Sequence, residues 1–196
     1  MPFKTTFFAL IALSFAAALP GCGDKEPTTD DSSTPTDDSG DSGADDTGTP
    51  SEAPEVFINE FMASNATIIA DDEGGFGDWI ELYNATAAAV DLSGWFLTDD
   101  LASPEKHVLG AISIPAGGFV LLWADDDILD GDEHLSFKLS GDGEDLALYT
   151  PDGVAADELT YQAQTTDQSA ARFPDGGETW EITDAPTPGA TNGDGT

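Results

Sequence analysis

Short apolar segments separated by turn residues dominate the chain from residue 55 onward. Residues 135–139 alternate apolar with polar side chains, which is typical of a strand that buries one face. Residues 119–123 are apolar throughout, which favours a central strand of a sandwich. We expect strands at residues 56–61, 79–83, 95–97, 119–123, 135–139, 146–149, around 159–161, and at 180–182. Since no segment carries a long helical period, we expect at most a turn or two of helix.

Turn-forming residues separate these segments at fairly even spacing. The clusters of glycine, proline, serine and aspartate lie at residues 74–75, 93–94, 115–118, 141–143, 150–153 and 174–177. Many short strands with regular turns predict an all-β sandwich or barrel. All four Trp and all three Tyr lie between residues 55 and 192. This length and aromatic content predict a single domain with one core over 55–192.

The N-terminus has the pattern of a secretion signal. Lys4 precedes an apolar segment, Phe7 to Leu19, that only Ser14 interrupts. A membrane-spanning helix needs about 20 apolar residues, so this shorter segment fits the hydrophobic region of a signal peptide instead. We therefore expect residues 1–21 to be a signal peptide that is removed after export.

Cys22 is the only cysteine of the chain, so it cannot form an internal disulfide. The segment Leu19-Pro20-Gly21-Cys22 resembles the lipobox of bacterial lipoproteins. The resemblance implies cleavage before Cys22, diacylglycerol on its thiol, acylation of the new N-terminus and attachment to the cell envelope. Gly23 stands where Asp favours the inner membrane, so the resemblance favours the outer membrane if the source is Gram-negative. The alternative is an ordinary secreted protein with a cysteine near its cleavage site.

Residues 24–54 differ in composition from the rest. Of these 31 residues, ten are acidic, eighteen are Ser, Thr, Gly or Pro, and the only apolar ones are Ala44 and Ala53. Such a segment buries too little apolar surface to offset the entropy cost of ordering it. We expect residues 22–54 to be the lipidated Cys22 followed by a disordered acidic tether, and residues 193–196 to be a disordered tail. A loose calcium-binding segment or a glycosylated stalk are alternatives for the tether.

The charge of the chain narrows its partners. Without Lys4, four basic residues stand against 39 acidic ones. Such a chain repels nucleic acid phosphates and anionic lipid head groups, which argues against nucleic acid binding. The same charge favours cationic partners and divalent metal ions.

Several segments taken in order resemble the lamin tail domain, an immunoglobulin-like β-sandwich. The matching segments are residues 58–60, 78–84, 90–95, 114–118, 137–139, 143–149, 172–176 and 186–192. The resemblance implies the fold more than a function. Bacterial lamin tail domains occur on secreted and surface proteins, where they resemble interaction or attachment modules. Arg172 is one of three cations between residues 55 and 192, and we expect it to meet a carboxylate at the edge of the sandwich.

Candidates for chemistry are few. The histidines, His107 and His134, do not have the spacing of a metal motif, and no Gly-x-Ser-x-Gly elbow is present. Glu60 and Glu81 lie on strands that the family pairs, so they are candidates for a carboxylate-based hydrolase. The alternative is that these carboxylates bond backbone amides or Arg172.

The richest acidic cluster is a candidate calcium site, because calcium prefers six to eight oxygen ligands. Its acidic residues are Asp125, Asp126, Asp127, Asp130, Asp132 and Glu133. The order is not that of an EF-hand, and a solvated acidic loop is the alternative. The sequence as a whole predicts a non-enzymatic, lipid-anchored binding or structural module with no cofactor, whose protein or glycan partner is not specified. A calcium-dependent adhesive module and a hydrolase are the other hypotheses.

Overall fold

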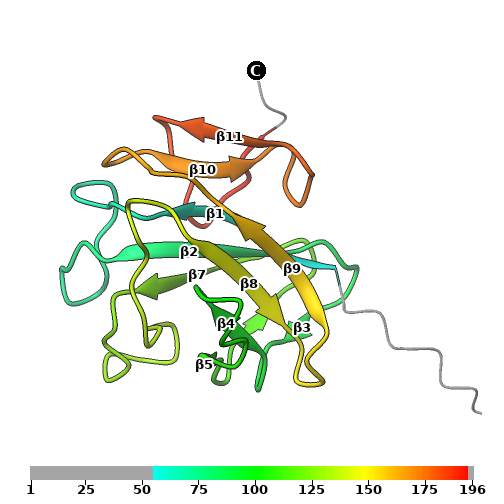
Figure 1. Cartoon of the computed structure of the whole chain (residues 1–196). Coiled ribbons are helices and arrows are strands. Elements are labelled where there is room, and N and C mark those ends of the chain that lie inside the picture. Colours follow the sequence, from blue (N-terminus) through cyan, green and yellow to red (C-terminus); the bar gives the residue numbers. More distant parts are fainter. Residues whose placement is uncertain (1–54, 194–196) are drawn as a thin grey trace, which may run out of the picture. The chain divides into compact units, whose positions relative to one another are not determined.

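The computed structural model describes residues 55–193, which form antiparallel sheets and contain no helix (Figure 1). The strands are β1 (Val56–Met62), β2 (Asp78–Asn84), β3 (Val90–Asp91), β4 (Phe96–Thr98), β5 (His107–Val108), β6 (Ser113–Ile114), β7 (Phe119–Ala124), β8 (Asp145–Tyr149), β9 (Ala155–Thr160), β10 (Ser169–Arg172) and β11 (Trp180–Thr183). The prediction of an all-β immunoglobulin-like sandwich is therefore confirmed.

The larger sheet has five strands in the order β11-β10-β1-β2-β7. Its centre is β1, which pairs with β10 on one side and β2 on the other. The register of β1 against β2 shifts between Ile58 and Glu60, so Asn59 forms a bulge. Bulges redirect side chains and bend the strand. Beyond this bulge Glu60 lies directly opposite both Glu81 and Ala171.

The second sheet has four strands in the order β5-β4-β8-β9, and β3 pairs with β6 in a small separate sheet. Residues of both larger sheets share one core: Ile58, Phe61, Ile80 and Leu82 come from the first, and Leu97, Leu146 and Leu148 from the second. All of them are buried. Burial of apolar surface contributes about 25 cal/mol per Å², so this shared core holds the two sheets face to face.

The position of β7 differs from the prediction of a central strand. It lies at the edge of the five-stranded sheet, beside β2. β7 is apolar for another reason: apolar side chains also cover the outer face of this sheet. Trp123 and Leu121 pack with Met62, Trp79 and Ile69 in a second apolar cluster on that face. Both faces of β7 are thus apolar although only one faces the main core.

Residues 135–139 are not a strand, which corrects that prediction. They lie beside β7 and bend at Ser136 and Phe137, with isolated bridges from His134 to Trp123 and from Lys138 to Asp125. The alternation nevertheless has the expected effect, because Leu135, Phe137 and Leu139 are buried. The segment also covers the free edge of β7, since Leu135 N–H donates to the Trp123 carbonyl at 2.8 Å.

The predicted signal peptide, Cys22 and the predicted tether lie outside the described residues, as do residues 194–196. Within residues 55–193, the structure has no apolar helix of a length that would cross a bilayer.

Candidate functional site

Two glutamates lie buried side by side on the outer face of the five-stranded sheet. Glu60 and Glu81 are each 0% exposed and sit opposite each other on β1 and β2. Glu60 accepts hydrogen bonds from the Ser169 hydroxyl at 2.5 Å and from the Thr187 hydroxyl at 3.0 Å. The Thr187 N–H also donates to both Glu60 oxygens, at 3.0 and 3.2 Å. Burial raises the pKa of Glu60, and these hydrogen bonds oppose the rise.

Glu81 is held in a similar way. Its Oε1 accepts from the Asn59 side-chain amide at 3.1 Å, and its Oε2 accepts from the Gly189 N–H at 2.6 Å. Burial raises the pKa of Glu81 to about 7, and the charges of Glu60 and Asp175 add to the rise. Both carboxylates therefore hold the C-terminal segment against the sheet. They do not line an open cleft, which is the arrangement a glycosidase needs to admit its substrate.

The same C-terminal segment is bound further along. Asn192 donates from its side-chain amide to the carbonyls of Asn59 and Arg172, at 3.2 and 3.0 Å. Asp175 accepts from the Asn192 N–H at 2.9 Å and from the Thr191 hydroxyl at 2.5 Å. We call residues 186–192, together with these contacts, the C-terminal strap. It is anchored to the bulge of β1 by side chains whose hydrogen-bonding groups would otherwise lie buried without partners.

Arg172 joins the two sheets from the opposite face. Its guanidinium bonds both carboxylate oxygens of Asp157 on β9 at 2.9 Å, and its Nε donates to the Ile58 carbonyl at 2.8 Å. The group also lies 4.5 Å from the centre of the Trp180 ring. The expected carboxylate partner of Arg172 is thus confirmed and is Asp157. Both of these bonds come from Arg172 Nη2, and this charge-assisted pair links β9 to β10.

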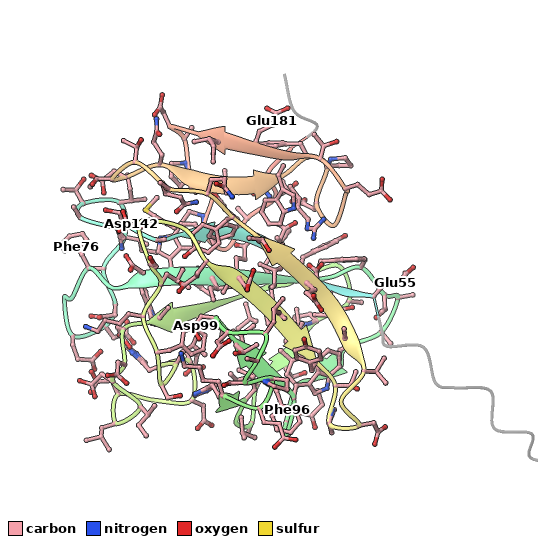
Figure 2. All side chains as sticks on the ribbon, viewed as in Figure 1. Glu55, Phe76, Phe96, Asp99, Asp142 and Glu181 are labelled. Atoms are coloured by element: carbon pink, nitrogen blue, oxygen red, sulfur yellow. The ribbon has the colours of Figure 1, made fainter. Side chains whose placement is uncertain are left out.

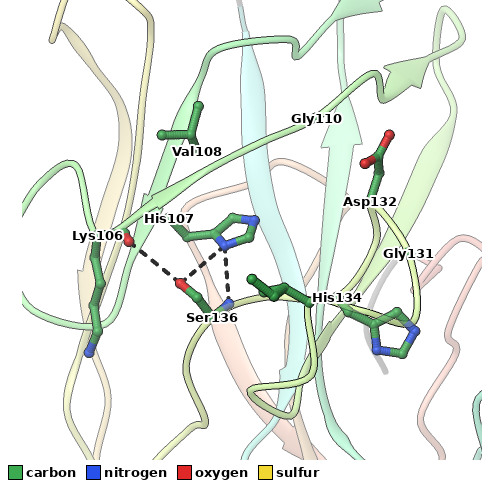
Figure 3. A pocket seen from close by; sticks show the side chains of 9 residues that line it. Lys106, His107, Val108, Gly110, Gly131, Asp132, His134 and Ser136 are labelled. Carbon is green, nitrogen blue, oxygen red and sulfur yellow. Dashed lines mark hydrogen bonds between the residues drawn. The ribbon is translucent and has the colours of Figure 1, made fainter.

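A pocket of about 350 Å³ lies between β5 and residues 128–136 (Figure 3). His107 and Ser136 meet in it, with 3.2 Å between His107 Nδ1 and Ser136 Oγ. However, the same Nδ1 accepts the Ser136 N–H at 3.0 Å, so this lone pair already has a backbone donor. Burial lowers the pKa of His107, which favours the neutral ring. The pair therefore fastens the segment after Gly131 to β5, rather than forming a charged catalytic dyad.

The acidic loop after β7 does not converge on one point. Asp125 bonds His134 Nδ1 at 2.8 Å, and Asp132 accepts the Ala111 N–H at 3.3 Å. Asp126, Asp127, Asp130 and Glu133 are exposed. Across residues 55–193, no three His, Cys, Asp or Glu side chains are grouped so that they could hold a metal ion. Calcium binding by this loop stays a prediction. His134, which contacts Asp125 in this loop, is buried.

Two members of the loop face a second acidic segment that is distant in sequence. Asp130 and Glu133 line a hollow of about 370 Å³ together with Asp71, Asp72 and Glu73. The Trp123 and His134 rings, stacked at 6.5 Å, form part of its lining. Carboxylates also lie at the periphery elsewhere, as the exposed side chains of Glu55, Asp142 and Glu181 show (Figure 2).

The comparison with protein families agrees with this architecture. The Lamin Tail Domain matches residues 49–163, which is more than half of the chain. The chain belongs to the lamin tail domain family. Comparison with curated proteins gives no significant match. The family match ends before β10, yet β10 and β11 complete the five-stranded sheet of this lamin tail domain.

The sequence placed Glu60 and Glu81 together but did not assign their partners. Thr187, Gly189 and Asn192 belong to a segment to which the sequence assigned no role. A signal existed, because two carboxylates in otherwise apolar strands require donors, and few cations are present to supply them. Nothing in the sequence indicated that those donors would come from about 110 to 130 residues away.

Proposed function

We propose that this chain is an exported lipoprotein, lipidated at Cys22, that displays its lamin tail domain at the cell envelope as a non-catalytic binding or structural module. The observation that carries the non-catalytic part is the saturation of Glu60 and Glu81. Their oxygens accept hydrogen bonds from the C-terminal strap and neighbouring side chains. A carboxylate so occupied, beneath a strap, is poorly placed to exchange protons with a substrate.

The N-terminal sequence supports the anchoring part. A short apolar segment ends in Leu19-Pro20-Gly21-Cys22, and an acidic segment of low apolar content follows. Two or more acyl chains give durable membrane attachment, whereas one gives only marginal attachment. A flexible chain of 31 residues spans about 30 Å on average, and repulsion among its carboxylates extends it further. The tether would hold the domain clear of the bilayer.

Membrane fractionation of the full chain in a bacterial host tests this proposal. The parent chain should sediment with membranes and incorporate labelled palmitate, and Cys22→Ala should abolish both. Ser14→Ala, a change within the apolar segment, is the matched control and should leave both unchanged. Sedimentation of Cys22→Ala with the membranes would contradict the anchor. In a Gram-negative host, Gly23→Asp should shift the chain from the outer to the inner membrane.

A further inference from the structure

The two large sheets of the sandwich end at different places. Ile182 on β11 lies directly opposite Ala170 on β10, so both side chains point to the same face of the sheet. Ala170 is 5% exposed and belongs to the core, whereas Ile182 is 60% exposed. The inner face of the sheet therefore continues past the core. The opposite sheet ends at β9 and leaves this part uncovered.

A pocket of about 330 Å³ occupies the uncovered position. It is lined mainly by apolar and aromatic side chains, among them Phe61, Leu159, Tyr161, Trp180 and Ile182. Phe61 forms its floor and packs against the rings of Tyr161 and Trp180, at 4.7 and 5.5 Å between centroids. An apolar pocket with a preformed aromatic floor offers a place for an aliphatic side chain.

The edge of β9 beside this pocket has backbone groups that face outward. Tyr161 N–H donates to the carbonyl of Glu144, the residue opposite it. Residues of an antiparallel strand turn their backbone groups alternately to the two edges, so Leu159 faces β8 while Glu158 and Thr160 face away. Consistent with this, the Glu158 N–H donates to the Asp157 side chain at 3.0 Å rather than to β8. Figure 1 shows β9 and β11 as the outer strands of their sheets.

We infer that this open edge of β9 receives an extended segment of a partner protein, which adds a strand to the smaller sheet and covers the inner face of β10 and β11. A strand added there lies about 4.8 Å from β9, and its alternate side chains point into the sandwich. One of those side chains fills the pocket between Phe61, Trp180 and Ile182.

Charge identifies the partner as basic. Between residues 55 and 193, 28 acidic residues stand against Lys106, Lys138 and Arg172. Glu158 is exposed on the outer face of β9, where the side chain opposite it on an added strand would be most favourable as Lys or Arg. The partner segment therefore alternates apolar residues, which face the pocket, with basic residues, which face solvent.

Two other occupants fit less well. The acidic segment 24–54 of this chain has no branched aliphatic or aromatic residue to fill the pocket. A second copy of the domain would bring another acidic surface against Glu158, and like charges directly opposite on adjacent strands are destabilising. The inference names the partner class of the binding module proposed above and rests on that proposal.

Fluorescence anisotropy with a labelled eight-residue peptide of alternating Val and Lys tests the inference on the full chain in detergent. The chain should bind this peptide, and Ile182→Lys should weaken binding about tenfold or more, because it places a cation in the pocket. Ile128→Lys is the matched control, since Ile128 is exposed to a similar extent, 57%, and the charge change is the same. It should alter binding by less than about twofold.

Three binding results would overturn the inference. They are equal binding by the two lysine variants, equal binding of a Val–Glu peptide, and no binding at peptide concentrations near 1 mM, roughly the weakest useful affinity. Sedimentation that shows a dimer lost in Ile182→Lys would overturn it as well, because a second copy would then occupy the edge. The Cys22→Ala fractionation reports on display alone, so failure of either experiment is distinguishable from failure of the other.

Discussion

The domain contains two groups of carboxylates, one buried and one exposed to solvent. Glu60 and Glu81 are fully buried, and each accepts hydrogen bonds from donors of other segments. In the loop after β7, Asp126, Asp127, Asp130 and Glu133 are exposed to solvent. A buried carboxylate is costly unless it is hydrogen-bonded, whereas an exposed one is stabilised by water. The denser acidic cluster in the sequence is therefore not the one on which the fold depends.

The largest expected effect is that of Glu60→Ala. The substitution leaves the Ser169 hydroxyl and the Thr187 N–H without their acceptor, whereas the Thr187 hydroxyl keeps Asn192 Oδ1 at 2.7 Å. We expect a loss of about 3–5 kcal/mol in the free energy of unfolding, since each unsatisfied buried donor costs about 1–3 kcal/mol. Urea denaturation measures it. Glu181→Ala, at an exposed position of β11, is the control and should stay within about 0.5 kcal/mol of the parent. A small effect of Glu60→Ala would show that the strap contributes little to stability.

The next effect concerns pH. Burial raises the pKa of Glu81 from 4.5 to about 7, so the folded chain binds this proton more tightly than the unfolded chain does. The resulting stabilisation is fully present below pH 4.5 and is lost as the pH rises through about 7. The change is on the order of 3 kcal/mol. Burial also raises the pKa of Glu60, which acts in the same direction.

Denaturation curves across this pH range test the point. Glu81→Gln should flatten the dependence, because the amide does not titrate, while the exposed Glu158→Gln should retain it. Stability that increases with pH in the parent chain would contradict the assignment. The pKa values of Asp91 and Asp167 are lowered from 3.8 by hydrogen bonds, so their contributions fall at more acidic pH and outside this window.

Calcium should produce a smaller effect. Because Asp125 and Asp132 of the loop after β7 already accept hydrogen bonds from different partners, we expect thermal melts in millimolar calcium, in magnesium and in EDTA to agree within about 2 °C. A rise of several degrees with calcium alone would instead support the adhesive hypothesis and draw attention to the hollow that Asp130 and Glu133 share with Asp71.

Asp127→Asn should have the smallest effect. Asp127 is exposed, and its backbone N–H, which donates to Asp125 at 3.1 Å, is retained in the variant. We expect a change in the free energy of unfolding within about 0.5 kcal/mol, measured by the urea midpoint. A loss above about 1 kcal/mol would place this loop with the buried carboxylates and remove the contrast between the two groups.

Much of the fold followed from local patterns. The segments around Ile58, Ile80 and Leu148 were predicted as strands because they are short apolar segments between turns, and all three residues are buried. The prediction was wrong for residues 135–139, where the alternation is real but the partner is an edge covered through isolated bridges. The prediction that β7 is a central strand was also wrong, because β7 lies at an edge of its sheet. An edge strand with apolar side chains on both faces has the same sequence pattern as a central strand.

Less of the candidate site could be predicted from the sequence. The sequence brought Glu60 and Glu81 together through the family resemblance, and it indicated that Arg172 would meet a carboxylate. It did not indicate that Asp157 would be this carboxylate, since that pairing depends on how the two sheets pack. The pocket beside β9 was not predicted at all, because its lining comes from β1, β9, β10 and β11 together.

The sequence by itself determined the class of the fold and the strongly acidic charge of the chain. These properties depend on composition and on short-range periodicity, which a chain carries without any tertiary contact. Only the tertiary structure decided that two glutamates hold the C-terminal strap and that the larger sheet extends beyond the smaller one. Both depend on contacts between residues about a hundred positions apart in the sequence. The strap contacts form because a buried carboxylate needs hydrogen-bond donors, and the carboxylates are buried only in the folded chain.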